Sequence, residues 1–185
     1  MIIEIISGSP RANSLTHRVA LNLKSWFIKN TSHEVDIISL QKWEIPPIQS
    51  VWVSAEKAPL ALRPLAERVF TADAFILVTP EYNGSYSPAM KNLLDHFPKQ
   101  LHKPFGIVTA SPGAMGGIRA SQQLLLLVPA LFGITSPNML IVPSVDQKFD
   151  EEGNLLDMKF QNVINTFTTE FLWLAEKLVE EKIPV

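Results

Sequence analysis

The stretch AFILVTPEYNGSYSP, residues 74–88, places an unbroken apolar run directly before a polar loop. A short continuous run rich in aromatic and aliphatic residues is typical of a strand that is buried on both faces of a parallel sheet. The loop that follows, 79–88, is rich in turn-forming residues and contains both tyrosines of the chain. A plain connection needs fewer residues. We therefore expect this loop to bind a ligand at the end of the strand.

Strand-like and helix-like patterns alternate on both sides of this stretch. The expected strands are 2–6, 35–40, 74–79, 105–110 and 139–142. The expected helices lie near residues 15–27, 64–71, 90–97, 118–131 and 160–178. This alternation predicts an α/β fold, in which a parallel sheet carries helices on both faces. We expect a single domain over residues 1–185, because no repeat, linker or low-complexity tract divides the chain.

The composition excludes several classes of protein. The chain has 185 residues, of which 46% are hydrophobic and 18% charged, as in an ordinary globular domain. A net charge of −2 argues against nucleic acid as a partner, which needs a basic face. The sequence shows neither an apolar run of membrane-spanning length nor a basic leader, so we expect a cytoplasmic protein. It has no cysteine, and its 4 histidines lack ligand spacing, so we expect no metal site.

Three loops of the predicted sheet deserve comparison as ligand-binding segments. In open parallel sheets, ligands bind outside the carboxyl ends of the strands, near the point where the strand order reverses. The loops at that edge are SGSPRANSLT (7–16), TPEYNGSYSP (79–88) and ASPGAMGG (110–117). The last is rich in glycine, which lets a backbone approach a flat ligand closely. Glycine and proline are also common before any helix, so the composition of this loop does not by itself indicate a ligand site.

The first of these loops has the composition of a phosphate site. Hydroxyl and guanidinium groups suit phosphate oxygens, and the N-terminus of the following helix favours an anion. The residues that offer these groups are Ser9, Arg11, Ser14 and Thr16. A plain helix cap at Asn13 or Ser14 explains part of the pattern equally well. The G-x-x-x-x-G-K-[ST] and G-x-G-x-x-G patterns are both missing, which argues against a P-loop NTPase and a dinucleotide Rossmann site.

Three segments together resemble the NADPH-dependent FMN reductase family. They are GSPRANSLT (8–16), TPEYNGSYSPAMKNLLDH (79–96) and SPGAMGGIRA (111–120). This flavodoxin-like family includes enzymes that reduce FMN, quinones, azo dyes and chromate. The resemblance implies a three-layer sandwich around a five-stranded parallel sheet of order 2-1-3-4-5. It also implies FMN as the cofactor, NADPH or NADH as the electron donor, and a homodimer or homotetramer.

The resemblance assigns roles to individual residues. The phosphate of FMN would be held by Ser9, Arg11, Ser14 and Thr16. The isoalloxazine would be lined, largely by backbone groups, by Pro80, Glu81, Tyr82, Asn83 and Gly84. Its other edge would lie near Ser111 and Gly113. The chain departs from the family pattern at Thr16, at Ser87-Pro88 and at His96, a position expected near the flavin and a subunit interface.

Three functions are compatible with these features. The first is an FMN-dependent oxidoreductase that transfers a hydride from NAD(P)H through FMN to a small-molecule electron acceptor. The flavin would carry the chemistry, so no catalytic side chain is expected. The second is a flavodoxin-type electron carrier, and the third a nucleotide-binding module without redox activity. Electron carriers are typically strongly acidic, and the near-neutral charge of this chain favours the enzyme.

Overall fold

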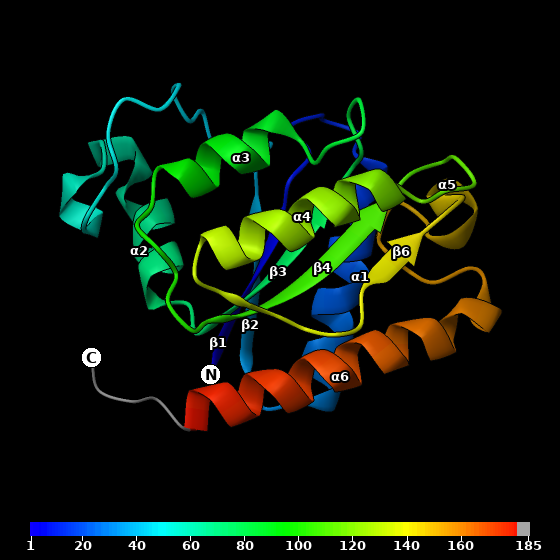
Figure 1. Ribbon diagram of the computed structural model, residues 1–185. Helices are drawn as coiled ribbons and strands as arrows, with labels where there is room; N and C mark the ends of the chain where they lie inside the picture. The colour runs from blue at the N-terminus through cyan, green and yellow to red at the C-terminus, as the bar shows by residue number, and fades with distance from the viewer. Residues whose placement is uncertain (181–185) are drawn as a thin grey trace.

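The computed structural model describes residues 1–180 as alternating strands and helices (Figure 1). The strands are β1 (Ile2–Ser7), β2 (Glu34–Ser39), β3 (Ala74–Thr79), β4 (Pro104–Ala110), β5 (Ile134–Thr135) and β6 (Leu140–Val142). The helices are α1 (Leu15–Asn30), α2 (Arg63–Thr71), α3 (Pro88–Asp95), α4 (Ile118–Ala130), α5 (Val145–Lys148) and α6 (Gln161–Glu180). One-turn 3₁₀ helices lie at Ala55–Lys57, Leu60–Leu62 and Met158–Phe160.

The sheet is parallel, and its strand order confirms the flavodoxin-like prediction. Within residues 1–180 it has six strands, in the order β2-β1-β3-β4, with β5 and β6 both paired to β4. The strand expected at 139–142 is β6, and β5 was not expected. Ser136 N still donates to Phe105 O at 2.8 Å, and the chain leaves the sheet at Pro137, which cannot donate a ladder hydrogen bond. Two short strands therefore share the fifth position.

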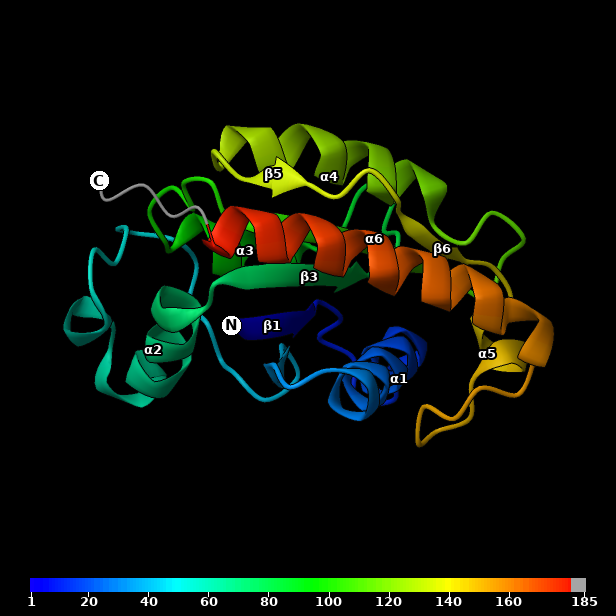
Figure 2. The same cartoon turned by 90° about the horizontal axis from the view of Figure 1, so that it is seen from below.

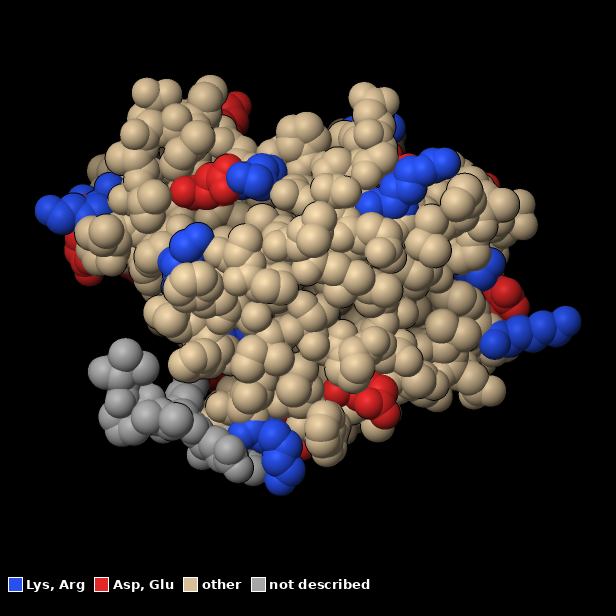
Figure 3. Space-filling view, in the orientation of Figure 1, with Lys and Arg blue, Asp and Glu red and all other residues tan. Residues whose placement is uncertain are grey.

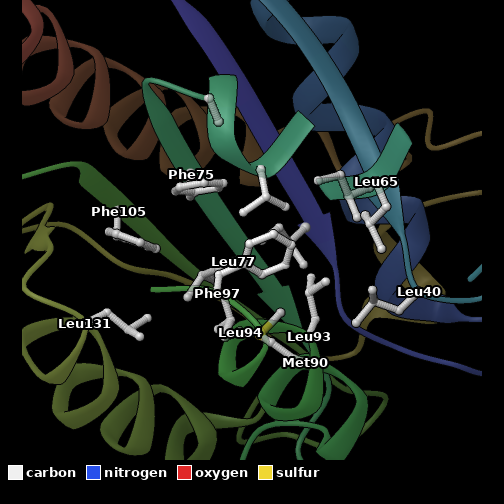
Figure 4. Packing of buried hydrophobic residues seen from close by; sticks show 14 of the residues in the cluster. Leu40, Leu65, Phe75, Leu77, Met90, Leu93, Leu94, Phe97, Phe105 and Leu131 are labelled. Carbon is white, nitrogen blue, oxygen red and sulfur yellow. The ribbon is translucent and has the colours of Figure 1, made fainter. Parts of the chain in front are cut away.

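Two hydrophobic cores cover the two faces of the sheet, as alternating strand side chains require. Ile6 points into the core beneath α2, α3 and α4, whereas its neighbour Ile5 points into the core beneath α1 and α6. Figure 4 shows part of the first core, in which the rings of Phe75 and Phe105 stack with centroids 5.2 Å apart. In Figure 2, α6 lies in front of the strands with α1 beside it. The expected three layers are confirmed.

Local sequence signals explain where the helices that border the candidate site begin. Ser14 and Ser87 are the N-caps of α1 and α3, and their side chains accept hydrogen bonds from His17 N and Met90 N. Pro88 is the first residue of α3, where its missing N–H costs nothing. The short α5 was not expected, because four residues are too few to show a helical period. In the part of the chain described here, no helix is sufficiently long and apolar to cross a membrane.

Candidate functional site

The loops after β1 and β3 are joined by direct hydrogen bonds at the carboxyl edge of the sheet. Gly8 N donates to Val78 O at 2.8 Å, and the Ser87 hydroxyl donates to Gly8 O. Ser87 N in turn donates to the Thr79 hydroxyl at 3.0 Å. A Cβ on Gly8 would lie 2.5 Å from Met90 Cε, so the close approach of the two loops favours glycine. These loops and the one after β4 gather at the upper right of Figure 1.

The first loop presents hydroxyl groups around the N-terminus of α1. Ser9 and Thr16 are buried, and the Ser14 hydroxyl accepts from His17 N at 3.3 Å. The helix-cap interpretation of Ser14 is therefore confirmed, and it leaves the hydroxyl hydrogen of Ser14 for another acceptor. The first turn of α1 contains no acidic residue. The positive end of the helix dipole at this loop is thus not offset by a carboxylate of its own first turn.

His17 lies beneath this loop, a place that the sequence analysis did not assign to it. Its Nδ1 lies 2.9 Å from the hydroxyl of Ser7, the last residue of β1. Burial, together with the nearby charge of Lys42, lowers the pKa of the imidazole below its ordinary value. The His17 side chain is therefore neutral at pH 7 and adds no fixed charge to the loop.

Arg11 connects the first loop with the loop after β3. Its guanidinium carbon lies 4.8 Å from the centroid of the Tyr82 ring, a cation–π arrangement. The Arg11 carbonyl accepts a hydrogen bond from Gln41 Nε2, so the segment after β2 also contacts this loop. Two residues that the sequence analysis took from separate motifs are therefore neighbours. The predicted contact of Arg11 with a phosphate stays a prediction.

The loop after β3 contains a tight hairpin that explains its Asn-Gly pair. Tyr82 N donates to Ser85 O at 2.8 Å, and Ser85 N donates to Tyr82 O at 3.1 Å. Asn83 and Gly84 between them have φ of 51° and 83°. Positive φ at both central residues is the signature of a type I′ turn, for which Asn-Gly is the preferred pair. The phenol oxygen of Tyr82 is buried and lacks a hydrogen-bond partner within residues 1–180.

The glycine-rich loop after β4 is held by the segment that joins β6 to α5. Ser111 N donates to Val142 O at 3.1 Å, and Val145 N donates to Ser111 O at 3.2 Å. Gly113 is exposed, and its carbonyl accepts from Gly116 N at 3.2 Å. Ser111 and Gly113 therefore lie at the same sheet edge as the other two loops. The sequence analysis made no prediction for this supporting segment.

Glu81 and His96 have protein partners of their own. The Glu81 carboxylate accepts from Arg119 N at 3.0 Å and from Arg119 Nη1 at 3.3 Å. Pro80 precedes it and is partly buried.

The His96 side chain is only 2% exposed, and its ring lies 4.3 Å from that of Trp52, measured between centroids. His96 therefore packs into the core instead of lining an open surface.

Several supporting residues were missed by sequence reasoning. Ser87 followed by Pro88 is a recognisable helix-start signal and could have been found. Arg119 and Gln41 contact residues far away in the sequence, and no local pattern marks them. Thr79 acts within its own loop, where its hydroxyl accepts from Ser87 N. Within residues 1–180, no group of histidine, aspartate and glutamate side chains is arranged to hold a metal ion.

Comparison with known proteins agrees with this geometry. The chain is 32% identical over 166 residues to an FMN-dependent NADPH-azoreductase of Staphylococcus aureus, and the match covers 85% of this chain and 86% of the relative. FerB, a flavoenzyme NAD(P)H:(acceptor) oxidoreductase from Paracoccus denitrificans, superposes with a TM-score of 0.79 at 23% identity, covering 95% of this chain and 97% of FerB.

The fold is also similar to that of a flavodoxin. A flavodoxin from Pseudomonas aeruginosa superposes with a TM-score of 0.59 at 16% identity, covering 92% of this chain and 99% of the flavodoxin. At such identities the likeness shows the fold alone. The sequence profile of the NADPH-dependent FMN reductases matches residues 1–147, which is more than half of the chain. The chain thus belongs to the NADPH-dependent FMN reductase family.

Proposed function

We propose that this protein uses NADPH or NADH to reduce a small-molecule acceptor, such as a free flavin, a quinone, an azo dye or chromate. It is an FMN-dependent oxidoreductase by its family. When bound, FMN accepts a hydride from the nicotinamide and passes electrons on, while the protein supplies position and electrostatics. The proposal is supported by the meeting of three candidate loops, those after β1, β3 and β4, at one edge of the sheet. The azoreductase relative supports an azo dye among the acceptors.

The groups of the first loop fit the phosphate of FMN. Two hydroxyls, those of Ser9 and Ser14, flank the start of a helix whose first turn has no acidic residue. Arg11 belongs to the same loop and is exposed, and its guanidinium lies over the Tyr82 ring. Backbone N–H groups and the positive end of a helix dipole are a recurrent phosphate site. We assign Ser9, Arg11, Ser14 and Thr16 to this end of the cofactor.

The second and third loops fit the flat ring of FMN. The I′ turn at Asn83-Gly84 keeps the backbone of Pro80 to Gly84 compact, with the Tyr82 ring beside it. The exposed Gly113, next to Ser111, adds no side chain that would block a planar ligand. We assign residues 80–84, Ser111 and Gly113 to the isoalloxazine. Chemistry at the ring needs no acid or base from these side chains.

Substitution of Arg11 by alanine is expected to weaken FMN binding by about 1.5–3 kcal/mol and riboflavin binding much less. The reason is the loss of a charge-assisted hydrogen bond to a phosphate, which riboflavin lacks. Fluorescence titration of the apoprotein with both flavins measures the difference. Arg63→Ala on α2, also exposed, is the matched control and should bind as wild type. Equal losses of affinity for FMN and riboflavin would show that Arg11 does not contact the phosphate.

The proposed reaction is tested by mixing FMN-loaded protein with NADPH or NADH without oxygen. The absorbance band of oxidised flavin should bleach, and addition of a quinone or an azo dye should restore it. If neither nucleotide bleaches the band within minutes but dithionite does, the protein is an electron carrier. If FMN does not bind at all, the nucleotide-binding module becomes the better interpretation.

The face over α4 supports the expected self-association into a homodimer or homotetramer. Figure 3 shows this face as largely uncharged, with scattered lysine, arginine and acidic residues. Its exposed apolar side chains are Leu101, Ile118, Leu126 and Phe132. A contiguous exposed apolar surface commonly marks a protein–protein contact. Light scattering after size-exclusion chromatography should give a multiple of the 20.6 kDa chain mass.

The cytoplasmic location stays a prediction.

A further inference from the structure

The N-terminus of α4 is capped by a residue that is distant in sequence. The helix follows Gly117, which has φ of 84°, offers no side-chain cap and leaves the first N–H groups of α4 to other partners. Glu81 supplies one partner from the loop after β3, because its Oε2 accepts from Arg119 N at 3.0 Å. Its Oε1 accepts from Arg119 Nη1 at 3.3 Å. One carboxylate therefore joins two loops of the candidate site.

Glycines on both sides of this contact lie close to the side chains that form it. A Cβ on Gly117 would lie 3.2 Å from Thr109 Cβ and 3.6 Å from Glu81 Cβ. A Cβ on Gly84 would lie 3.8 Å from Arg119 Cδ. The loop 80–85 thus lies close to the start of α4, about one methyl group away at these two glycines. The Glu81 side chain is only 16% exposed, whereas that of Arg119 is 65% exposed, so Glu81 is the fixed member of the pair.

The charges at this contact balance. The Glu81 carboxylate faces the Arg119 guanidinium and the N-terminus of α4, so opposite charges meet at this contact. Each of its oxygens already accepts a hydrogen bond from the protein. A carboxylate bound in this way is poorly suited to exchange protons with a substrate. Its geometry suits the attachment of one loop to another.

We propose that Glu81 is a positioning residue that fixes the 80–84 backbone against the 111–117 loop, the two segments between which the flavin ring binds. The inference rests on the proposed function, because it concerns the ring end of the same site. Glu81 accepts a hydrogen bond from Arg119 N at the N-terminus of α4. The Arg119 side chain donates a second hydrogen bond to the same carboxylate. The phosphate end of the cofactor, around α1, does not depend on Glu81.

The variants Glu81→Ala, Glu81→Gln and Arg119→Ala test the proposal by titration of the apoproteins with FMN and with riboflavin. Glu81→Ala should weaken both ligands by the same factor, about tenfold, because it removes a charge-assisted acceptor at the ring end. Glu81→Gln keeps an oxygen that accepts from Arg119 N and should restore most of the affinity. Arg119→Ala keeps the backbone contact and should lose about threefold or less. The double variant Glu81→Ala/Arg119→Ala should bind no worse than Glu81→Ala.

Thermal unfolding of the apoproteins and steady-state kinetics distinguish the positioning role of Glu81 from a role in overall stability or in proton transfer. The melting temperatures should agree within a few degrees, since the contact lies at a loop. Unchanged affinities for both flavins in Glu81→Ala would overturn the proposal. A large loss of kcat in Glu81→Gln with normal flavin affinity would also overturn it, since that result assigns proton chemistry to the carboxylate. Failure of the wild-type protein to bind FMN would contradict the proposed function itself.

Discussion

Replacement of Arg68 by leucine is expected to lower the free energy of unfolding by about 3–5 kcal/mol. Arg68 on α2 donates to both carboxylate oxygens of Glu4 on β1, from Nε at 2.8 Å and from Nη2 at 2.5 Å. The Glu4 side chain is only 5% exposed. Burial raises the pKa of Glu4 above its ordinary value, although the hydrogen bond and charge of Arg68 oppose that rise. Without Arg68, a buried charge would have no arginine partner.

The deficit of Arg68→Leu should depend on pH in a defined direction. A carboxyl group whose pKa is higher in the folded than in the unfolded state contributes stability at low pH, which is lost as the pH rises through the folded pKa. Loss of Arg68 raises the pKa of Glu4 further. The deficit should therefore be largest near about pH 8 and smaller near about pH 5.

Urea unfolding of wild type, Arg68→Leu and two controls at both pH values measures this effect. Arg63→Leu, an exposed arginine of the same helix, should change the free energy of unfolding by less than about 0.5 kcal/mol. The double variant Glu4→Met/Arg68→Leu removes both charges and should recover most of the loss. An equal deficit at both pH values would show that lost packing, and not the unpaired carboxylate, causes the destabilisation.

The Gly116→Val variant is expected to lose roughly 3–5 kcal/mol of stability and most of its affinity for FMN. Gly116 has φ of 59°, a conformation that a β-branched residue adopts only under strain. A Cβ there would lie 2.7 Å from Pro143 N, 2.8 Å from Ile141 Cγ2 and 2.9 Å from Val142 C. Two of these atoms belong to the backbone and cannot turn away. The glycine-rich loop would have to move from β6, together with Ser111 and Gly113.

Gly113→Ala is the matched control in the same loop. Its Cβ would meet only Ser111 Oγ, at an ordinary contact distance of 3.6 Å. Thermal unfolding should therefore shift little, so this variant is the control for the stability change alone. If Gly116→Val has the melting temperature of wild type, β6 and the loop separate easily. The claim that residue 116 has no room for a side chain would then be wrong.

The parts of the fold that depend on local pattern could be predicted from the sequence. The strand at 74–79 has the predicted bounds, because an apolar run between Asp73 and Pro80 has clear limits. The helix cap at Ser14 is likewise a short-range property. The position of the ligand edge follows from parallel order alone, so the three loops could be chosen before any contact was known.

Contacts between distant segments could not be predicted in this way. The Glu81 carboxylate meets Arg119, 38 residues away, and nothing in either neighbourhood signals the pair. The ion pair of Glu4 and Arg68 spans 64 residues, and no local pattern around Glu4 indicates its partner. The division of the fifth strand also went unseen, since two residues at 134–135 carry no period. Such features depend on how distant elements pack against each other, and local patterns in a single sequence do not reveal that packing.

The divided fifth position of the sheet bears on how this protein avoids aggregation. A long, flat edge strand offers a row of unpaired backbone groups to the sheet of another molecule. Here that edge consists of Ile134–Thr135 and Leu140–Val142, and neither piece is long enough to template a cross-molecular ladder. At the opposite edge, β2 carries the exposed acidic residue Glu34 and the ion pairs of Asp36 with Lys24 and Arg68, and such charged groups disfavour pairing with another edge. Extension of the sheet from one copy to the next is therefore disfavoured on both sides, and concentrated solutions should stay free of amyloid-like material.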